Sequence, residues 1–185
     1  MVKEILSETR TEMRKSVEAF RDETLTVRTG RANVSLLDSI RVEYYGSQVP
    51  INQVANVGSP EPRLIVIQPW DKTVIPQIEK GIMSSNLGLV PANDGTNIRL
   101  PIPQLTEERR KEIVKIVKHM AEEGRISVRN ARRDANDLLK EAQKEGDVPE
   151  DESKKGQEEV QKLTDEFIKE IDGILAEKEE EIMEV

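Results

Sequence analysis

The stretch from Thr106 to Lys144 constrains the fold most, because its apolar residues recur with the spacing of one long helix. The steps between them are three or four positions long and average about 3.6 residues. This apolar stripe consists of Ile113, Val117, Met120, Gly124, Val128, Ala131, Ala135, Leu138 and Ala142. A helix with one apolar stripe is stable only when it packs against neighbours, so the sequence predicts a helical bundle. The small residues in the middle of the stripe allow a neighbouring helix to come close.

Basic residues gather on a second side of the same predicted helix. At about 100° per residue they fall within an arc of about 100°, centred about 115° from the apolar stripe. At about 1.5 Å per residue this basic face extends for about 40 Å. The basic face consists of Lys111, Lys115, Lys118, Arg125, Arg129, Arg132, Arg133 and Lys140. A continuous cationic surface of this length favours the binding of a polyanion.

Two further stretches have helical spacing, and a β-rich segment separates the first of them from the long helix. Residues 2–28 and 150–183 each carry one apolar stripe, whereas short β-rich runs with turn residues between them occupy 40–100. The predicted fold class is therefore α+β: an elongated three-helix bundle with an inserted small β/α/β domain. The bundle is expected to comprise 1–29 plus 106–185, and the inserted domain 31–104, with hinge linkers at 28–32 and 101–105. The expected hinge residues are Thr29, Gly30, Arg31, Pro101, Pro103 and Leu105.

The charge of the chain is unevenly distributed. The formal net charge is −8, but residues 1–104 are neutral, 105–144 carry +3 and 145–185 carry −11. An acidic chain as a whole is a poor partner for nucleic acid. The local field of a basic segment attracts a polyanion regardless of the total, so nucleic acid remains a possible partner.

Composition limits the possible activities. The sequence has no cysteine and a single histidine, and it contains no glycine-rich phosphate-binding loop. We therefore expect no metal, no cofactor and no enzymatic activity. Apolar runs are shorter than the roughly 18 residues that span a bilayer, and the N-terminus does not resemble a signal or transit peptide. These features predict a cytoplasmic protein without a membrane partner.

Short motifs along nearly the whole chain resemble the bacterial ribosome recycling factors. Each motif alone is weak, but their order and spacing together are specific. The motifs occupy residues 28–32 (RTGRA), 42–46 (VEYYG), 69–71 (PWD), 86–89 (NLGL), 93–95 (NDG), 103–111 (PQLTEERRK), 128–134 (VRNARRD) and 160–165 (VQKLTD). Two positions depart from the family pattern. Leu64 stands where the family often has Thr or Ser, and Val185 ends a chain that often ends in Phe, where a different C-terminal contact is the open alternative.

The resemblance implies an L-shaped molecule of two domains and a function in ribosome recycling. In that function the protein, with elongation factor G and GTP, splits the post-termination ribosome so that its subunits and the mRNA are reused. The resemblance also implies that the bundle lies on large-subunit ribosomal RNA, with Arg110, Arg129 and Arg132 on the RNA-facing or activity-sensitive surface. The full set of expected rRNA contacts is Arg110, Lys111, Lys118, Arg125, Arg129, Arg132, Arg133, Arg28 and Arg31. The implied partners are the large ribosomal subunit and elongation factor G, and the protein itself is expected to be a monomer.

Each expected site has a simpler structural interpretation. The arginines from Arg125 to Arg133 could pair with the acidic last helix instead of phosphate, and Arg125 and Arg132 lie nearest to it on the wheel. Arg28 and Arg31 fit hinge ion pairs as well as RNA contacts. Trp70 is expected in the core of the small domain, with a docking surface as the alternative, and His119 is expected to be solvated.

A second hypothesis is a coiled-coil scaffold or holdase-like helical protein. In that case the basic and acidic helices would pair between chains, and the protein would form a stable oligomer without a preference for ribosomes.

Overall fold

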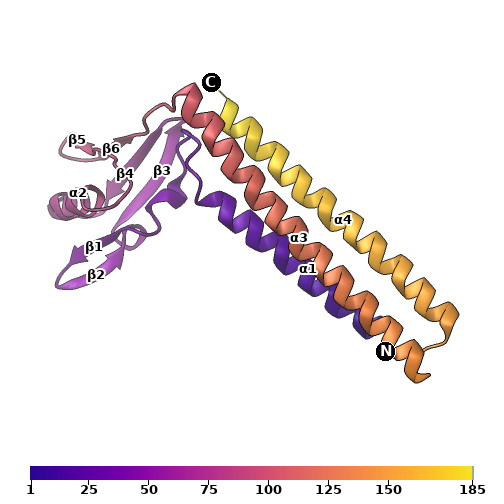
Figure 1. Cartoon of the computed structure of the whole chain (residues 1–185). Helices are drawn as coiled ribbons and strands as arrows, with labels where there is room; N and C mark the ends of the chain where they lie inside the picture. The colour runs from indigo at the N-terminus through magenta and orange to yellow at the C-terminus, as the bar shows by residue number, and fades with distance from the viewer. Residues whose placement is uncertain (185) are drawn as a thin grey trace. The chain divides into compact units, whose positions relative to one another are not determined.

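The computed structural model describes residues 1–184, and it divides the chain into two compact units. One unit is Met1–Val27 with Arg110–Val185, and the other is Arg28–Arg109. Figure 1 shows the long helices of the first unit and the sheets of the second. Val185, for which the sequence left a different C-terminal contact open, lies outside the described residues.

Three long helices form the first unit and lie side by side (Figure 1). They are α1 (Val2–Leu25), α3 (Glu107–Glu145) and α4 (Glu150–Met183). Each buries one stripe, and the centre of the core is made by Met13, Val17, Phe20, Ala121, Val128, Leu163, Phe167 and Ile171. Gly124 lets the helices approach, because a Cβ there would lie 3.3 Å from Cδ1 of Ile171. The predicted bundle is thus confirmed.

The ends of these helices follow from local hydrogen bonds. The hydroxyl of Thr106 accepts a hydrogen bond from the backbone N–H of Arg109 at 3.1 Å, so it caps α3. Helix α1 ends at Leu25, three residues earlier than expected. The hydroxyls of Thr24 and Thr26 donate to backbone carbonyls three residues back, an alternative to continuing the helix.

The buried line of α3 differs from the predicted stripe at three places, one of which is Ala131, which is only half-buried. Ala121 and Leu139 are fully buried, whereas Met120 is only half-buried and Leu138 is 47% exposed. Leu138 lines an open groove of about 290 Å³ between α1 and α3. Small and polar side chains such as Thr9 and Ala131 also line that groove.

The second unit contains two antiparallel sheets and one short α-helix. The strands β1 and β2 form a hairpin, and the larger sheet has the order β3-β4-β6-β5. The elements in chain order are η1 (Val34–Leu37), β1 (Arg41–Tyr44), β2 (Ser47–Pro50), η2 (Ile51–Gln53), β3 (Ala55–Glu61), β4 (Leu64–Pro69), η3 (Lys72–Val74), α2 (Ile75–Met83), β5 (Ala92–Asn93) and β6 (Ile98–Pro101). Together with the bundle, these elements confirm the α+β class. Pro50 marks a break between strands: β2 ends at Pro50 and β3 begins at Ala55.

The core of the small unit is aliphatic, and α2 packs tightly on the hairpin. Ile65, Ile67, Ile78, Ile82 and Ile98 are fully buried in it. A Cβ on Gly81 would lie 2.8 Å from the backbone oxygen of Arg41, so only glycine fits between α2 and β1. The prediction that Trp70 belongs to this core is wrong, since its side chain is 63% exposed. Branched aliphatic residues fill the core, and Trp70 follows Pro69, the last residue of β4.

Candidate nucleic-acid interface

The basic face of α3 is present, but its residues differ in how far internal carboxylates neutralise them. Arg125 is the most neutralised. Its Nη2 lies 2.7 Å from Oδ1 of Asp172 on α4, and its Nη1 lies 3.0 Å from Oε2 of Glu122. The Arg125 side chain is only 19% exposed. Burial opposes its charge, but the hydrogen bonds to Asp172 and Glu122 outweigh burial and raise its pKa above the ordinary value. Of the two interpretations that the sequence left open for Arg125, pairing with the acidic last helix is therefore the one present in the structure.

Arg129 shares a carboxylate with Arg125. Its Nη1 lies 3.1 Å from Oε1 of Glu122, while Oε2 of the same carboxylate binds Arg125. Hydrogen bonds from Arg125 and then from Arg129 lower the pKa of Glu122. Arg129 is more accessible than Arg125, with 43% of its side chain exposed. One carboxylate thus serves two guanidinium groups on this part of α3.

Arg132 faces a neutral partner on α4. Its Nη1 donates to Oε1 of Gln161 at 3.3 Å, and Nε2 of Gln161 in turn donates to Asp165 at 2.9 Å. An amide therefore stands where Asp172 stands for Arg125. The guanidinium of Arg132 keeps its full charge and most of its donors for another anion.

Arg133 and two lysines have no side-chain partner in the described part of the chain. Within residues 1–184, no hydrogen bond or ion pair involves the side chains of Arg133, Lys115 and Lys140, and all three are exposed. Lys115 and Lys140 were not among the expected contact residues, although both lie on the basic face. Their position on the helical wheel was the signal that could have found them.

The other expected contact residues are divided between paired and unpaired. Nζ of Lys118 lies 3.7 Å from Glu179 on α4. Arg110 is half-buried, and its Nε is buried without a hydrogen-bond partner. Lys111 and Arg31 are exposed and each interacts with another residue, whereas exposed Arg28 has no such interaction with the described chain. The structure therefore does not make one uniform surface from the nine expected residues.

The residues expected at the hinge lie at the ends of the small unit. Thr29 is 8% exposed, and Gly30 has a φ of +78° in the left-handed region that glycine tolerates. A Cβ on Gly30 would lie 3.3 Å from Cγ of Leu105, so the two linkers touch here. On the returning linker, Pro101 is the last residue of β6, and exposed Pro103 follows two residues later.

The remaining features of the described chain give no sign of a metal site or of a membrane-spanning helix. His119 is exposed, with Nε2 3.3 Å from Glu123, as expected of a solvated histidine. No group of three or more metal-ligating side chains occurs among residues 1–184. None of the described helices combines the length and apolarity needed to cross a membrane.

Comparison with known proteins gives one consistent result over the full length. The sequence model of a family described as ribosome recycling factor matches residues 20–183. The chain is 56% identical to the ribosome-recycling factor of Desulforamulus reducens and 55% identical to that of Bacillus subtilis, each over 185 residues and 100% of both chains.

Solved structures agree with the sequence comparison. A solution structure of a ribosome recycling factor covers 100% of this chain and 98% of its own, with a TM-score of 0.79 and 43% identity. A second match, with a TM-score of 0.68 and 49% identity, covers 99% of both chains. It comes from models of the T. thermophilus ribosome recycling factor and the E. coli elongation factor G bound to the E. coli post-termination complex.

Proposed function

Because this chain belongs to the ribosome recycling factor family, whose members are non-enzymatic translation factors, we propose that it splits post-termination ribosomes together with elongation factor G and GTP. In this proposal the bundle docks on large-subunit rRNA through the basic face of α3. The protein acts as a cytoplasmic monomer, and the energy comes from the GTPase partner.

The observation that carries the docking proposal is the set of cations that internal carboxylates leave unpaired. Arg132 meets only an amide, while Arg133, Lys115 and Lys140 have no partner in residues 1–184. A guanidinium group offers paired donors that match two phosphate oxygens, and it stays charged when water is removed. These four residues are the core of the proposed rRNA contact. Arg129 joins them from the edge, and Arg125 serves the bundle instead.

The bundle is suited to compete with inter-subunit contacts for rRNA, because its basic face lies on a long helix that packs against two others. The favourable free energy of rRNA binding can offset the loss of contacts between the ribosomal subunits. We assign the inserted domain, 31–104, the role of the lever on which elongation factor G acts. The linkers 28–32 and 101–105, with Thr29, Gly30, Arg31, Pro101, Pro103 and Leu105, are the proposed hinge.

The contacts inside the bundle weigh against the scaffold hypothesis. That hypothesis needs the acidic last helix to pair with the basic helix of another chain. Here Asp172 and Glu179 of α4 already pair with Arg125 and Lys118 of the same chain. Intramolecular pairing of this kind favours a monomer.

The direct test is a subunit-splitting assay with purified post-termination ribosomes. The chain with elongation factor G and GTP is expected to release free subunits, and omission of the chain or of GTP should prevent release. Sedimentation of the chain with isolated large subunits, at increasing salt, measures docking separately. Splitting activity that is absent under all these conditions would refute the proposed function.

A further inference from the structure

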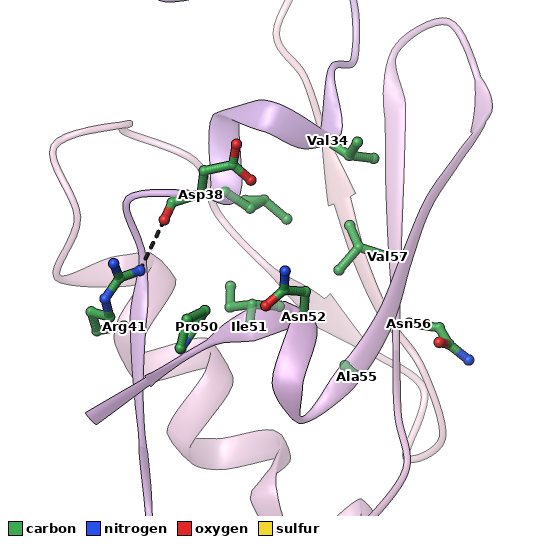
Figure 2. Close-up of a pocket in the computed structure, with 10 residues that line it drawn as sticks. Val34, Asp38, Arg41, Pro50, Ile51, Asn52, Ala55, Asn56 and Val57 are labelled. Carbon is green, nitrogen blue, oxygen red and sulfur yellow. Dashed lines mark hydrogen bonds between the residues drawn. The ribbon is translucent and has the colours of Figure 1, made fainter. Parts of the chain in front are cut away.

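A pocket and a groove of the described chain lie away from the basic face of α3. The pocket beside β3, of about 530 Å³, lies in the small unit between η1, the β1-β2 hairpin and the start of β3 (Figure 2). Its floor is closed, because Leu37, Ile51 and Ala55 are only 2–3% exposed. Its rim carries one cation and one carboxylate, Arg41 and Asp38, so it does not select a ligand by charge. The groove between α1 and α3 differs in both respects.

The groove, of about 290 Å³, runs lengthwise between α1 and α3, whose chains run in opposite directions (Figure 1). At one end of it the hydroxyls of Ser16 and Ser127 lie 2.9 Å apart. Ile5 and Leu138 stand at the other end, eleven residues away on each helix. At about 1.5 Å per residue, the groove is about 16 Å long. It lies on the α1 side of α3, whereas the basic face contacts α4.

The walls of the groove carry three exposed carboxylates and no cation. Glu8 and Glu12 come from α1, and Asp134 comes from α3. Within residues 1–184 no hydrogen bond or ion pair involves the carboxylates of Glu8 and Asp134, whereas Glu12 binds Lys15 at 2.8 Å. Glu8 and Asp134 lie eight and seven residues from the serine contact, so they stand at the same level on opposite walls. Two unpaired carboxylates at one level favour a cation between them.

An exposed leucine completes the pattern along the groove. Leu138 is 47% exposed and lies one turn beyond Asp134 on α3, while Glu12 lies one turn from Glu8 in the other direction on α1. The groove therefore presents, at intervals of about 6 Å, an apolar site, a site between two carboxylates and a site at a third carboxylate. Side chains at every fourth position of an α-helix share one face and have the same interval.

We propose that this groove binds a basic α-helical segment of another polypeptide, which lies along α1 and α3. An apolar side chain of the segment covers Leu138, an arginine or lysine one turn further lies between Glu8 and Asp134, and a second cation reaches Glu12. The carboxylates repel nucleic acid, and within residues 1–184 they are not grouped as a metal site. Charges of one sign on the walls and an exposed leucine at the end therefore specify a partner that is both cationic and apolar.

The test uses the whole chain and a blocked helical peptide, Ala-Ala-Gln-Leu-Ala-Ala-Gln-Arg-Ala-Ala-Gln-Arg-Ala-Ala-Gln. Its leucine and its two arginines occupy every fourth position and so share one face. A second peptide has citrulline, which is neutral and of similar shape, in place of both arginines. NMR titration of the chain is expected to show shifts at Leu138 and Asp134 that saturate with the arginine peptide. The citrulline peptide should bind about tenfold more weakly, and added salt should weaken only the arginine peptide.

Variants of the chain locate the binding in the groove. Glu8→Gln with Asp134→Asn should bind the arginine peptide about tenfold more weakly and leave binding of the citrulline peptide unchanged. Glu158→Gln with Glu177→Gln is the control for net charge, because both residues are exposed on α4 and have no hydrogen bond or ion pair in residues 1–184. Leu138→Ala should cost about fivefold, and only for peptides that keep the leucine.

The proposal is overturned by any of three results. The first is the absence of shifts at Leu138 and Asp134 at millimolar arginine peptide. The second is equal binding by the groove variant and its α4 control, which would mean that the net charge of the chain and not the groove attracts the peptide. The third is binding of spermidine as tight as that of the peptide, which would identify a polyamine site. None of these measurements uses ribosomes, so the outcome is independent of the proposed function.

Discussion

Two neighbouring segments of α3 carry the same kind of residue on the same face and yet have different surroundings. In the paired segment, Arg125 and Arg129 share Glu122, and Arg125 also binds Asp172 of α4. In the open segment, one to two turns further along, Arg132 meets only Gln161, and Arg133 meets no internal partner in residues 1–184. The difference is set by what lies opposite on α4: a carboxylate at the first segment and an amide at the second.

This difference separates two uses of arginine that a helical wheel does not distinguish. An arginine with two carboxylate partners and little exposure contributes to the stability of the bundle. An exposed arginine without a carboxylate contributes little to stability and is available to phosphate. We therefore expect mutations in the two segments to affect different measurements.

The largest expected effect comes from reversing the charges of the open segment. The double variant Arg132→Glu with Arg133→Glu should bind large subunits about 100-fold more weakly, since each charged hydrogen bond contributes about tenfold. The plot of log affinity against log salt concentration should become less steep, with the magnitude of its slope lower by about 1.5. The measurement is sedimentation with isolated large subunits at several salt concentrations.

A matched control for that variant is available on α4. Lys155 and Lys169 are exposed and have no partner in the described chain. Their double reversal to glutamate changes the net charge by the same amount away from the basic face. If the control weakens binding as much as the Arg132 and Arg133 variant, total charge and not the open segment determines docking.

The second prediction separates the effect of a substitution on stability from its effect on large-subunit binding. Arg125→Ala should lower the free energy of unfolding by about 1–2 kcal/mol, because it leaves Asp172 without its partner. Arg133→Ala should change it by less than about 0.5 kcal/mol. Large-subunit affinity should respond in the opposite order, and Arg133→Ala should have the larger effect, with about a tenfold loss. Urea unfolding and subunit binding of both variants are the measurements, and an identical profile for the two would remove the distinction between the segments.

The third prediction concerns a single substitution that gives the open segment an internal ion pair. Gln161→Glu places a carboxylate where the amide now accepts from Arg132 at 3.3 Å. Large-subunit affinity is expected to fall by about three- to tenfold, as an internal ion pair competes with phosphate. Gln77→Glu on α2 is the control for the added charge, and an unchanged affinity for Gln161→Glu would mean that Arg132 does not contact phosphate.

The smallest effect concerns the acid dependence of stability. Because Arg125 and Arg129 lower the pKa of Glu122 below its usual 4.5, folding favours the ionised form. The stabilisation is therefore fully present above pH 4.5 and is lost as the pH falls through the lowered pKa. Wild-type chain should resist urea slightly better than Glu122→Gln at pH 7, and the difference should disappear near pH 3. A difference that persists at pH 3 would show that Glu122 stabilises the bundle by something other than its charge.

The helical part of the fold could be predicted from the sequence because each long helix repeats one stripe over many turns. The ends of α4 at Glu150 and Met183 agree with the expected range. Which single side chains are buried depends on how neighbouring elements pack, and the sequence pattern does not show that packing. The exchange of Leu138 for Leu139 in the core depends on how α1 leaves a groove open, and the exposure of Trp70 depends on aliphatic residues that already fill the small core.

For the candidate site, the sequence located the basic face but not the state of its charges. That Arg125 lies near α4 was predictable from the wheel. That its partner would be Asp172, while the partner of Arg132 would be Gln161, depends on the axial register of two helices. The pocket beside β3 was not predicted, because it combines residues of η1, a hairpin and a sheet edge.

The carboxylate of Glu122 has a consequence for how the two segments would meet the same polyanion. Glu122 already occupies one donor of Arg129, so a phosphate that binds the remaining donors competes with this carboxylate for the charge of Arg129. When a phosphate takes the place of Glu122, the binding free energy gained is only the difference between two similar ion pairs. Few small ions are then released into solution. In the proposed docking, Glu122 would act as an internal counterion, so that this part of α3 would release RNA more readily than the turns beyond it.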